Sequence, residues 1–538
     1  MDADFVIVGG GSAGCVLANR LSADPSCRVV LIEAGGTGKG FMVSMPAGFG
    51  DTISKPGHSW HYHSAAEDAI AGRQMLLPRG RGLGGSSNIN GLLYVRGQHE
   101  DYDDWERGGA TGWGWDDVAP LFARSETYAN ANANANASDA ADPRGRRGPL
   151  RVEEDAHDDP TSRAVLDAFE QIGVPRNPDY NTGSQLGAFH YQLTVYGGRR
   201  CSAADAFLRP VMQRPNLQVI TDAHCRRVLF TGRRADGVEI EQRGATRIIR
   251  VAREIIVAAG AYHSPQILMQ SGIGPAGELA RNGIAVLHDS AQVGANLQDH
   301  FILTMSWRLR AGAFSYNREL GGARLVWNVL RYAATRKGPM TIPAAQTGAF
   351  VKSDPAVYRP DIQFHCLPVS GELDQGERVL SPYPGLSLAP CVLRPRSVGH
   401  VSLAGPDART PHIVHNYLTD EDDRRLSLRA MRMARELVAT PALSTMVERE
   451  AYPGAAAGTD DELLDYARRF GNTGYHPVGT CRMGSDENAV VDPQLRVRGV
   501  DGLRVIDASV MPRIVSGNTN AAAIMIGEKG ADMIMQRV

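Results

Sequence analysis

The chain has 538 residues, of which 43% are hydrophobic and 22% charged, and its formal net charge at pH 7 is −2. This composition excludes a largely disordered chain, and the length predicts two or more domains. The balanced charge, with basic residues scattered along the chain, argues against nucleic acid as a partner. Residues 1–8 lack the basic start and apolar run of a secretory signal, and no stretch of membrane-spanning length follows, so we expect a cytoplasmic protein.

The first predicted elements, within residues 4–33, are a β-strand, a glycine-rich turn, a helix and a second strand. Gly9, Gly11 and Gly14 have the G-x-G-x-x-G spacing of a dinucleotide-binding unit. The first glycine permits a tight turn, the second lets the backbone approach a pyrophosphate, and the third packs the helix on the sheet. Glu33 ends the second strand, where a carboxylate accepts from a ribose hydroxyl and repels the 2′-phosphate of NADP. These residues predict a bound dinucleotide.

Residues 79–91 (RGRGLGGSSNING) are the next glycine-rich segment and suit a backbone wrapped around a cofactor. Residues 80–103 resemble the first signature of the glucose-methanol-choline (GMC) oxidoreductases, flavoenzymes that oxidise alcohols with FAD. Five later segments resemble further signatures of this family in the same order: residues 260–274, 293–300, 475–484, 505–512 and 517–520. The likeness is strongest to the bacterial choline-dehydrogenase-like alcohol dehydrogenases. A nicotinamide dehydrogenase would share the first fingerprint but would not need the later segments.

Residues 129–148 interrupt this series with an unusual composition. Alanine and asparagine alternate at first, and Asp-rich and then Arg/Gly-rich residues follow. Asparagine favours turns over helix interiors, and alanine buries too little surface to order such a strip. We therefore expect an exposed loop, with a lid or a partner-binding loop as the alternative.

The resemblance implies an α/β protein (α+β overall) with two domains. A Rossmann-like FAD-binding domain is built from the discontinuous segments 1–155, 200–300 and 465–538, and a substrate-binding domain from 156–199 and 301–464. The substrate segment contains extended runs, such as residues 362–367, between Pro/Gly turns, and it ends in a helical stretch at 419–440. We expect these residues to form an antiparallel sheet with flanking helices.

Carried over position by position, the resemblance also implies the FAD-binding residues. The ADP half is assigned to Gly9, Gly11, Ser12, Ala13, Gly14, Glu33, Ala34 and Cys225. The pyrophosphate, isoalloxazine and ribityl chain are assigned to Gly84, Gly85, Ser86, Asn90, Gly91, Leu92, Val95, Ala259, Gly260, Asp507 and Ala508. Ile89 stands where some relatives carry a flavin-linking histidine, so we predict non-covalent FAD.

Alcohol oxidation removes the hydroxyl proton while hydride leaves the carbon for flavin N5, so the reaction needs a base beside the flavin. His476 matches the family's catalytic histidine, and an imidazole with an ordinary pKa of about 6.5 suits this task. Asn518 matches the hydrogen-bonding group that orients the alcohol. Asn520 is the alternative partner of His476, because the N-T-N repeat permits a two-residue slip; otherwise we place Asn520 beside the flavin pyrimidine.

The remaining histidines and the cysteines receive plainer interpretations. Three histidines within residues 58–63 lack the cysteine neighbours of a zinc site, so no metal is predicted. His300 is interpreted as structural, whereas His365 and His400 lie in the substrate segment and are candidates for substrate contact. The seven cysteines lack a C-x-x-C spacing and are expected to be buried, reduced thiols.

The substrate and the electron acceptor are less constrained by the sequence. Gln346 stands where choline-oxidising relatives carry a carboxylate, and a neutral amide weakens the case for a quaternary ammonium. Aromatic residues between 301 and 383 favour a primary aliphatic or aryl alcohol. We expect a quinone or similar carrier as acceptor, with peripheral membrane association through it. Gly474 leaves room for oxygen in the alternative of a peroxide-producing oxidase. Choline dehydrogenase, a non-redox lyase and a light-driven decarboxylase on the same fold are further alternatives.

Overall fold

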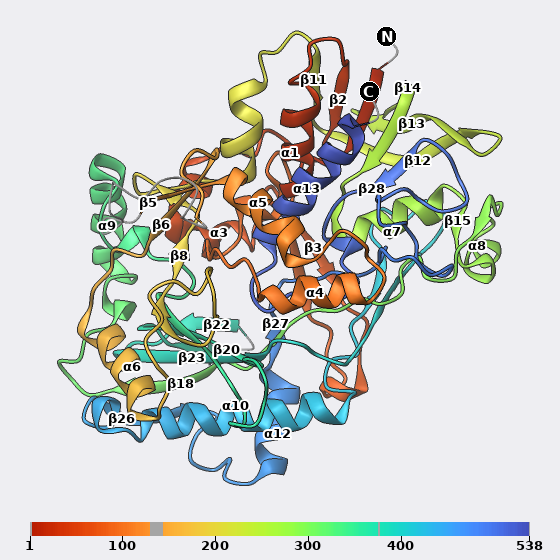
Figure 1. Cartoon of the computed structure of the whole chain (residues 1–538). Coiled ribbons are helices and arrows are strands. Elements are labelled where there is room, and N and C mark those ends of the chain that lie inside the picture. Colours follow the sequence, from red (N-terminus) through yellow and green to blue (C-terminus); the bar gives the residue numbers. More distant parts are fainter. Residues whose placement is uncertain (1–2, 130–143, 375–376, 537–538) are drawn as a thin grey trace.

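The computed structural model describes residues 3–129, 144–374 and 377–536 (Figure 1). Two large sheets and the helices around them confirm the predicted α/β class. Most of the loop predicted at 129–148 lies outside the described residues. In the part of the chain that the structure describes, no helix combines the length and the apolar character needed to cross a bilayer.

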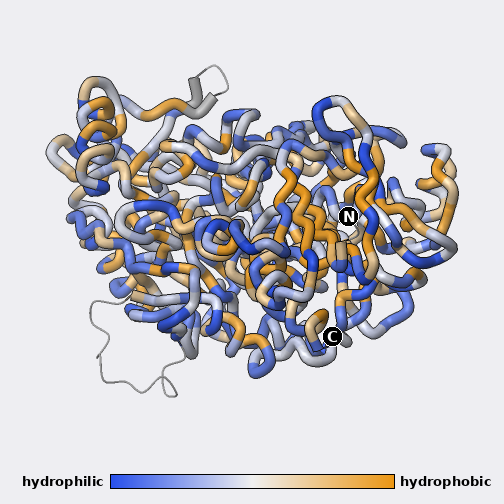
Figure 2. Tube along the Cα trace, turned by 90° about the horizontal axis from the view of Figure 1, so that it is seen from above, coloured by the Kyte–Doolittle hydropathy of each residue, from blue (hydrophilic) through white to orange (hydrophobic). Residues whose placement is uncertain are grey.

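The first sheet has seven strands and begins with the dinucleotide fingerprint. Its parallel strands are β11 Leu217–Ile220, β2 Val29–Ile32, β1 Ala3–Val8 and β14 Ala245–Val257, in that spatial order, with β28 Leu503–Val505 beside the end of β14. The antiparallel strands β13 Arg234–Gln242 and β12 Ala223–Thr231 continue from the other half of β14. The strands beside the N-terminus are hydrophobic almost throughout (Figure 2), because a parallel sheet is covered on both faces.

Helices from both ends of the chain cover this sheet. α1 Ser12–Leu21 packs on α13 Asn520–Met535 (Figure 1), and α13 also contacts α5 Trp115–Ser125, which packs on α4 His99–Arg107. A Cβ on Gly527 would lie 3.0 Å from the carbonyl oxygen of Ala13. Glycine at this position therefore allows α13 to approach α1 closely, and the C-terminal segment is brought to the first glycine turn.

The second sheet has eight strands, and all its pairings are antiparallel. Its main order is β26 Val447–Tyr452, β18 Met305–Leu309, β23 Gly385–Val392, β20 Ile362–Leu367, β19 Thr347–Val351 and β7 Gly187–His190. The short strands β17 Phe301–Ile302 and β27 Asn472–Thr473 complete it. β20 has the bounds predicted for residues 362–367. β27 comes from the segment that we assigned to the FAD-binding domain and brings the chain to this sheet just before His476.

Three capped helices cover the second sheet and complete its core. α6 Pro160–Gln171 packs on β7, β19 and β20, while α10 Glu421–Val438 packs on β23 and on α12 Asp460–Phe470. Their N-cap side chains, Asp159, Asp420 and Thr459, each accept a hydrogen bond from a backbone N–H of the first turn. The helix predicted at 419–440 is α10, two residues shorter at each end. The apolar faces of these helices join the sheet in a second hydrophobic core.

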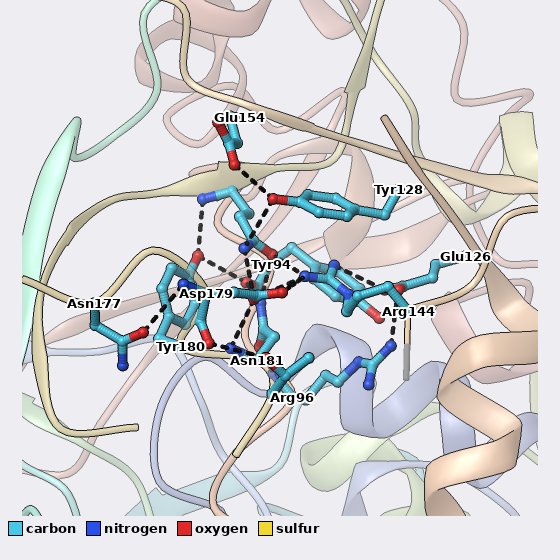
Figure 3. A network of polar contacts seen from close by, with 12 residues as sticks. Tyr94, Arg96, Glu126, Tyr128, Arg144, Glu154, Asn177, Asp179, Tyr180 and Asn181 are labelled. Atoms are coloured by element: carbon cyan, nitrogen blue, oxygen red, sulfur yellow. Dashed lines mark hydrogen bonds and ion pairs between the residues drawn. The ribbon is translucent and has the colours of Figure 1, made fainter. Parts of the chain in front are cut away.

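A buried network of charged groups joins Glu126, Arg96, Arg144 and Asp179 (Figure 3). Glu126, the first residue of β5 Glu126–Ala129, accepts hydrogen bonds from Arg96 Nη2 and Arg144 Nε, each at 2.7 Å. Arg144 also donates to Asp179 at 2.9 Å and lies 3.8 Å from the ring centroid of Tyr128. The prediction of an exposed loop up to residue 148 is therefore wrong at Arg144, which is buried because it neutralises two carboxylates.

Candidate functional site

The turn after β1 has the geometry that a dinucleotide requires. Gly9 has a φ of +107°, and a Cβ there would lie 2.4 Å from the carbonyl oxygen of Ala258. A Cβ on Gly14 would lie 1.9 Å from the carbonyl oxygen of Gly9, so α1 packs tightly on the turn. At Gly11, by contrast, the nearest atom to a Cβ is 4.0 Å away. Protein contacts explain the first and last glycine, whereas the middle one faces space for a ligand.

Glu33 ties the two glycine-rich segments together. Its Oε2 accepts from the backbone N–H of Gly10 at 2.9 Å, and its Oε1 accepts from those of Gly35 at 2.8 Å and Gly82 at 2.9 Å. Three N–H donors stabilise the charge of this buried carboxylate. Glu33, which is predicted to receive a ribose hydroxyl, thus also holds the two glycine-rich segments together.

One cavity extends along the ends of β1 and β14 and holds about 1090 Å³ of empty space, counting its open mouth. Most of the predicted cofactor positions line it: Gly9, Gly11, Ser12, Ala13, Glu33, Ala34, Gly85, Ser86, Cys225, Ala259, Gly260, Asp507 and Ala508. α1 and α7 Gly260–Gln270 both begin here without an acidic residue in the first turn, so their N–H groups suit a pyrophosphate. A Cβ on Gly260 would meet no atom within 4 Å. These features fit an extended dinucleotide such as FAD.

The other predicted cofactor positions do not line this cavity. The N–H of Gly84 donates to the carbonyl oxygen of Gly10 at 2.7 Å. Asn90 Oδ1 accepts from the N–H of Leu92 at 3.2 Å, and the side chains of Leu92 and Val95 are fully buried. Gly91 is pressed against Ala344, since a Cβ on it would lie 2.4 Å from the Cβ of Ala344. In the structure these positions hold the segment in shape, Gly84 and Asn90 through hydrogen bonds and Gly91, Leu92 and Val95 through packing.

His476 and Asn518 meet although they belong to different segments. Asn518 Nδ2 lies 3.1 Å from His476 Nε2. Asn520 is the first residue of α13 and instead accepts a hydrogen bond from the Ser12 hydroxyl at 2.8 Å. Of the two asparagines that the sequence left open, the structure therefore pairs Asn518 with His476, and Asn520 joins the starts of α13 and α1.

A buried histidine behind His476 determines which nitrogen carries its proton. His300 Nε2 lies 2.9 Å from the carbonyl oxygen of Leu393, an acceptor, so His300 is protonated at Nε2. Its Nδ1 is then an acceptor, and it lies 2.9 Å from His476 Nδ1. His476 must donate from Nδ1, so its Nε2 is unprotonated and is an acceptor on the side of Asn518. This tautomer is assigned from the hydrogen-bond partners.

A second chain of hydrogen bonds orients Asn518. The Tyr191 hydroxyl donates to the carbonyl oxygen of Phe364 at 3.0 Å, and it accepts from Gln363 Nε2 at 2.9 Å. Gln363 Nε2 also donates to Asn518 Oδ1 at 3.2 Å. Because the amide oxygen of Asn518 faces Gln363, its Nδ2 donor faces His476. His476 and Asn518 are partly accessible, whereas Gln363, Tyr191 and His300 behind them are fully buried.

Burial keeps the histidines of this cluster neutral. It lowers the pKa of His476 well below 6.5, and the nearby positive charges that His300, His365 and Arg79 can carry lower it further. Burial also lowers the pKa of His300 to about 4. The pKa of His365 is about 4 for the same reason, although hydrogen bonds to Ala389 and Asn518 oppose the shift. His365 therefore lies beside Asn518, while His400 is the exposed first residue of β24 His400–Ser402.

Asp299 and Gly474 hold the backbone of His476 in place. Asp299 accepts from the His476 N–H at 2.7 Å and also from the hydroxyls of Tyr417 and Thr473. Burial raises the pKa of Asp299 to about 6 against these hydrogen bonds. A Cβ on Gly474 would lie 2.9 Å from the Cβ of His300 and 3.3 Å from His476 Nδ1. The idea that Gly474 leaves room for oxygen is therefore wrong, because the two histidines fill that space.

Several residues of the site were missed or interpreted differently in the sequence. Trp60 and Tyr62 line the cavity from β3 Ser59–His63, and Arg79 lines it from β4 Leu76–Gly80 while donating to the carbonyl oxygen of Tyr475 at 2.6 Å. Trp60 and Tyr62 are two residues apart on a strand and therefore share one face, a pattern that could have been recognised in the sequence. His300, interpreted as structural, contacts His476 directly. All seven cysteines are free and buried, as predicted.

Comparisons with known proteins agree with this geometry. Residues 3–302 and 395–527 match the two GMC oxidoreductase family profiles. The chain is 40% identical to "Alcohol dehydrogenase [acceptor]" of Pseudomonas putida over 99% of this chain and 96% of that one. It is 39% identical to "Oxygen-dependent choline dehydrogenase" of Brucella ovis over 100% and 96%. The structure of pyridoxine 4-oxidase from Mesorbium loti superposes with a TM-score of 0.88 at 32% identity, over 99% of both chains.

The family match and these relatives place the chain among the oxidoreductases that act on CH–OH donors. The chain belongs to the GMC oxidoreductase family, whose members depend on FAD.

Proposed function

We propose that this protein oxidises a primary aliphatic or aryl alcohol to the aldehyde. The observation that carries the proposal is the unprotonated Nε2 of His476, which lies 3.1 Å from the Asn518 Nδ2 donor and is oriented by two buried hydrogen-bond chains. A neutral imidazole with an unprotonated ring nitrogen can act as a general base. An amide donor beside it suits an alcohol oxygen that becomes negatively charged.

FAD fits the cavity that the glycine turns leave open. We propose that Gly11, Ser12 and the first turn of α7 hold its pyrophosphate and that Glu33 receives a ribose hydroxyl. When bound, FAD supplies the acceptor for the hydride that leaves the alcohol carbon. We propose that binding is non-covalent, because Ile89 has no nucleophilic atom. Flavin that stays on the acid-precipitated protein would contradict non-covalent binding.

Two residues act on the alcohol oxygen and two others position them. His476 Nε2 takes the hydroxyl proton of the alcohol, and Asn518 Nδ2 donates a hydrogen bond to the same oxygen as its negative charge grows. His300 is a positioning residue that keeps the His476 proton on Nδ1. Gln363 is a second positioning residue, which keeps the Asn518 donor turned toward the substrate.

The surroundings of Gln346 support an alcohol without a positive charge. This side chain is fully buried, and its Nε2 donates to the Tyr316 hydroxyl at 3.1 Å while its Oε1 accepts from Ser162 at 3.3 Å. A neutral amide with both ends bonded gives a quaternary ammonium no compensating charge. Choline is the runner-up, supported by the relative from Brucella ovis. Steady-state rates with benzyl alcohol, octanol and choline separate the two, and a dominant choline rate contradicts the proposal.

We further propose a quinone or similar carrier as electron acceptor, rather than oxygen. The Pseudomonas putida relative, whose name specifies an acceptor, supports this choice, and the oxygen-dependent relative supports an oxidase as the alternative. Anaerobic reduction of the bound flavin by benzyl alcohol tests the reaction itself. Admission of air then tests the acceptor, since reoxidation within seconds identifies an oxidase. A flavin that no alcohol reduces would instead favour a lyase or a light-driven decarboxylase.

A further inference from the structure

One helix of this protein exposes a large apolar surface. α9 Gly322–Thr335 stands at the edge of the molecule (Figure 1). Its side chains Val326, Trp327 and Leu330 are 61%, 66% and 60% exposed. With 3.6 residues per turn, these three positions share one face of the helix. The other long amphipathic helices, α10 and α12, bury their apolar faces in the second core.

Specific contacts hold α9 so that this face points outward. Asn328 Nδ2 donates to the carbonyl oxygen of Glu319 at 3.0 Å. The Tyr332 hydroxyl donates to the carbonyl oxygen of Gly198 at 3.1 Å, and its ring packs edge-on against Phe41, with centroids 5.8 Å apart. Asn328 and Tyr332 lie one turn apart, so the helix is attached along one stripe. Phe41 is itself 43% exposed and packs on Tyr332, on the attached side of the helix.

The charged residues of the helix segment itself are all basic. Residues 321–337 contain Arg324, Arg331, Arg336 and Lys337 and no acidic residue. Arg324 is paired with Glu319, whereas Arg331 on the helix and Lys337 just after it are exposed. A second copy of this chain docked face to face would bring two such positive groups together. An anionic lipid surface complements both the charge and the apolar face, and tryptophan favours the boundary between headgroups and acyl chains.

We propose that the exposed face of α9 is a docking surface for an anionic phospholipid bilayer. Val326, Trp327 and Leu330 enter the boundary of the acyl chains, and the basic residues bind the headgroups. The helix lies in the plane of the interface and does not cross the bilayer. This inference stands on the exposed helix alone and does not depend on which alcohol or acceptor the enzyme uses.

Co-sedimentation of the FAD-loaded full-length protein with lipid vesicles tests this proposal. We expect binding to vesicles of equal parts phosphatidylcholine and phosphatidylglycerol, weaker binding to pure phosphatidylcholine, and release as ionic strength rises. Trp327 is the one exposed tryptophan of the six, all of which the structure describes, so its fluorescence should shift to shorter wavelength on binding. Trp327→Phe should remove this shift.

Replacing Val326, Trp327 and Leu330 together with serine should lower vesicle affinity at least about tenfold, because burial of even one large apolar side chain is worth that factor. The matched control replaces two exposed apolar residues elsewhere, Ile248→Ser and Tyr358→Ser, and should bind as the wild type does. Flavin reduction by benzyl alcohol in the same preparations reports on the proposed reaction separately. Absent vesicle binding, or equal binding by the triple variant, overturns the proposal. A concentration-dependent dimer that the triple variant abolishes, without vesicle binding, also overturns it and assigns the face to a second copy.

Discussion

Replacement of His300 by alanine tests the hydrogen-bond chain behind the proposed base. The substitution removes the acceptor 2.9 Å from His476 Nδ1 and leaves the carbonyl oxygen of Leu393 without its donor. The loss of one buried hydrogen-bond partner costs about 1–3 kcal/mol, which corresponds to a rate change of about 5- to 150-fold if it falls on the transition state. We expect the rate of flavin reduction by benzyl alcohol to fall by this factor, with little change in substrate affinity. Anaerobic stopped-flow measurement of flavin absorbance gives both quantities.

Two further variants separate this effect from damage to the fold. His300→Asn retains an oxygen acceptor facing His476 and should recover most of the lost rate. His99→Ala removes a partly buried histidine whose ring stacks on Trp115, away from His476 and the cavity lining, so it should lower the melting temperature without slowing reduction. FAD content and melting temperature are measured for each variant. A His300→Ala enzyme that is folded, loaded with FAD and as fast as the wild type would refute the assigned tautomer.

Three other predictions concern protonation, the glycine turn and the buried charges. Because the pKa of His476 is lowered well below 6.5, the base stays neutral as the pH falls from 8 to 6.5. The rate of flavin reduction should therefore not change over this range. A loss of rate centred near pH 7 would contradict the assignment of a neutral His476. Gly11→Ala should weaken FAD binding with little effect on apoprotein stability, whereas Gly9→Ala should destabilise the fold, and equal effects on both measurements would argue against a ligand at Gly11. The pKa of Glu126 is lowered to about 2, burial being outweighed by Arg96 and Arg144, so its stabilisation is complete above about pH 4.5 and is lost as the pH falls toward 2. Glu126→Gln should therefore lower the free energy of unfolding by about 3 kcal/mol near neutral pH. Melting curves should show the difference in stability between the variant and the wild type becoming smaller in acid. A stability difference that does not change with pH would count against this network.

Local sequence determined much of the fold, because some structural requirements act within a few residues. Gly9, Gly11 and Gly14 predict their turn since each needs a backbone without a side chain within a single strand-to-helix connection. Residues 362–367 predict β20, and residues 419–440 predict α10, from their own periodicity and end signals. Resemblance to a family then assigned the cofactor and proposed His476 as the base.

The tertiary structure decided what depends on contacts between distant segments. His300 and His476 are 176 residues apart, and they meet because β17 and β27 pair in the second sheet. The choice of Asn518 over Asn520 follows from where α13 begins against α1, which a two-residue repeat does not specify. The outward face of α9 also follows from packing, because the same amphipathic pattern could have covered a core. The spacing of apolar residues and glycines along the chain determines which helices and strands form. The packing of the two sheets and their helices decides which side chains meet and which stay exposed.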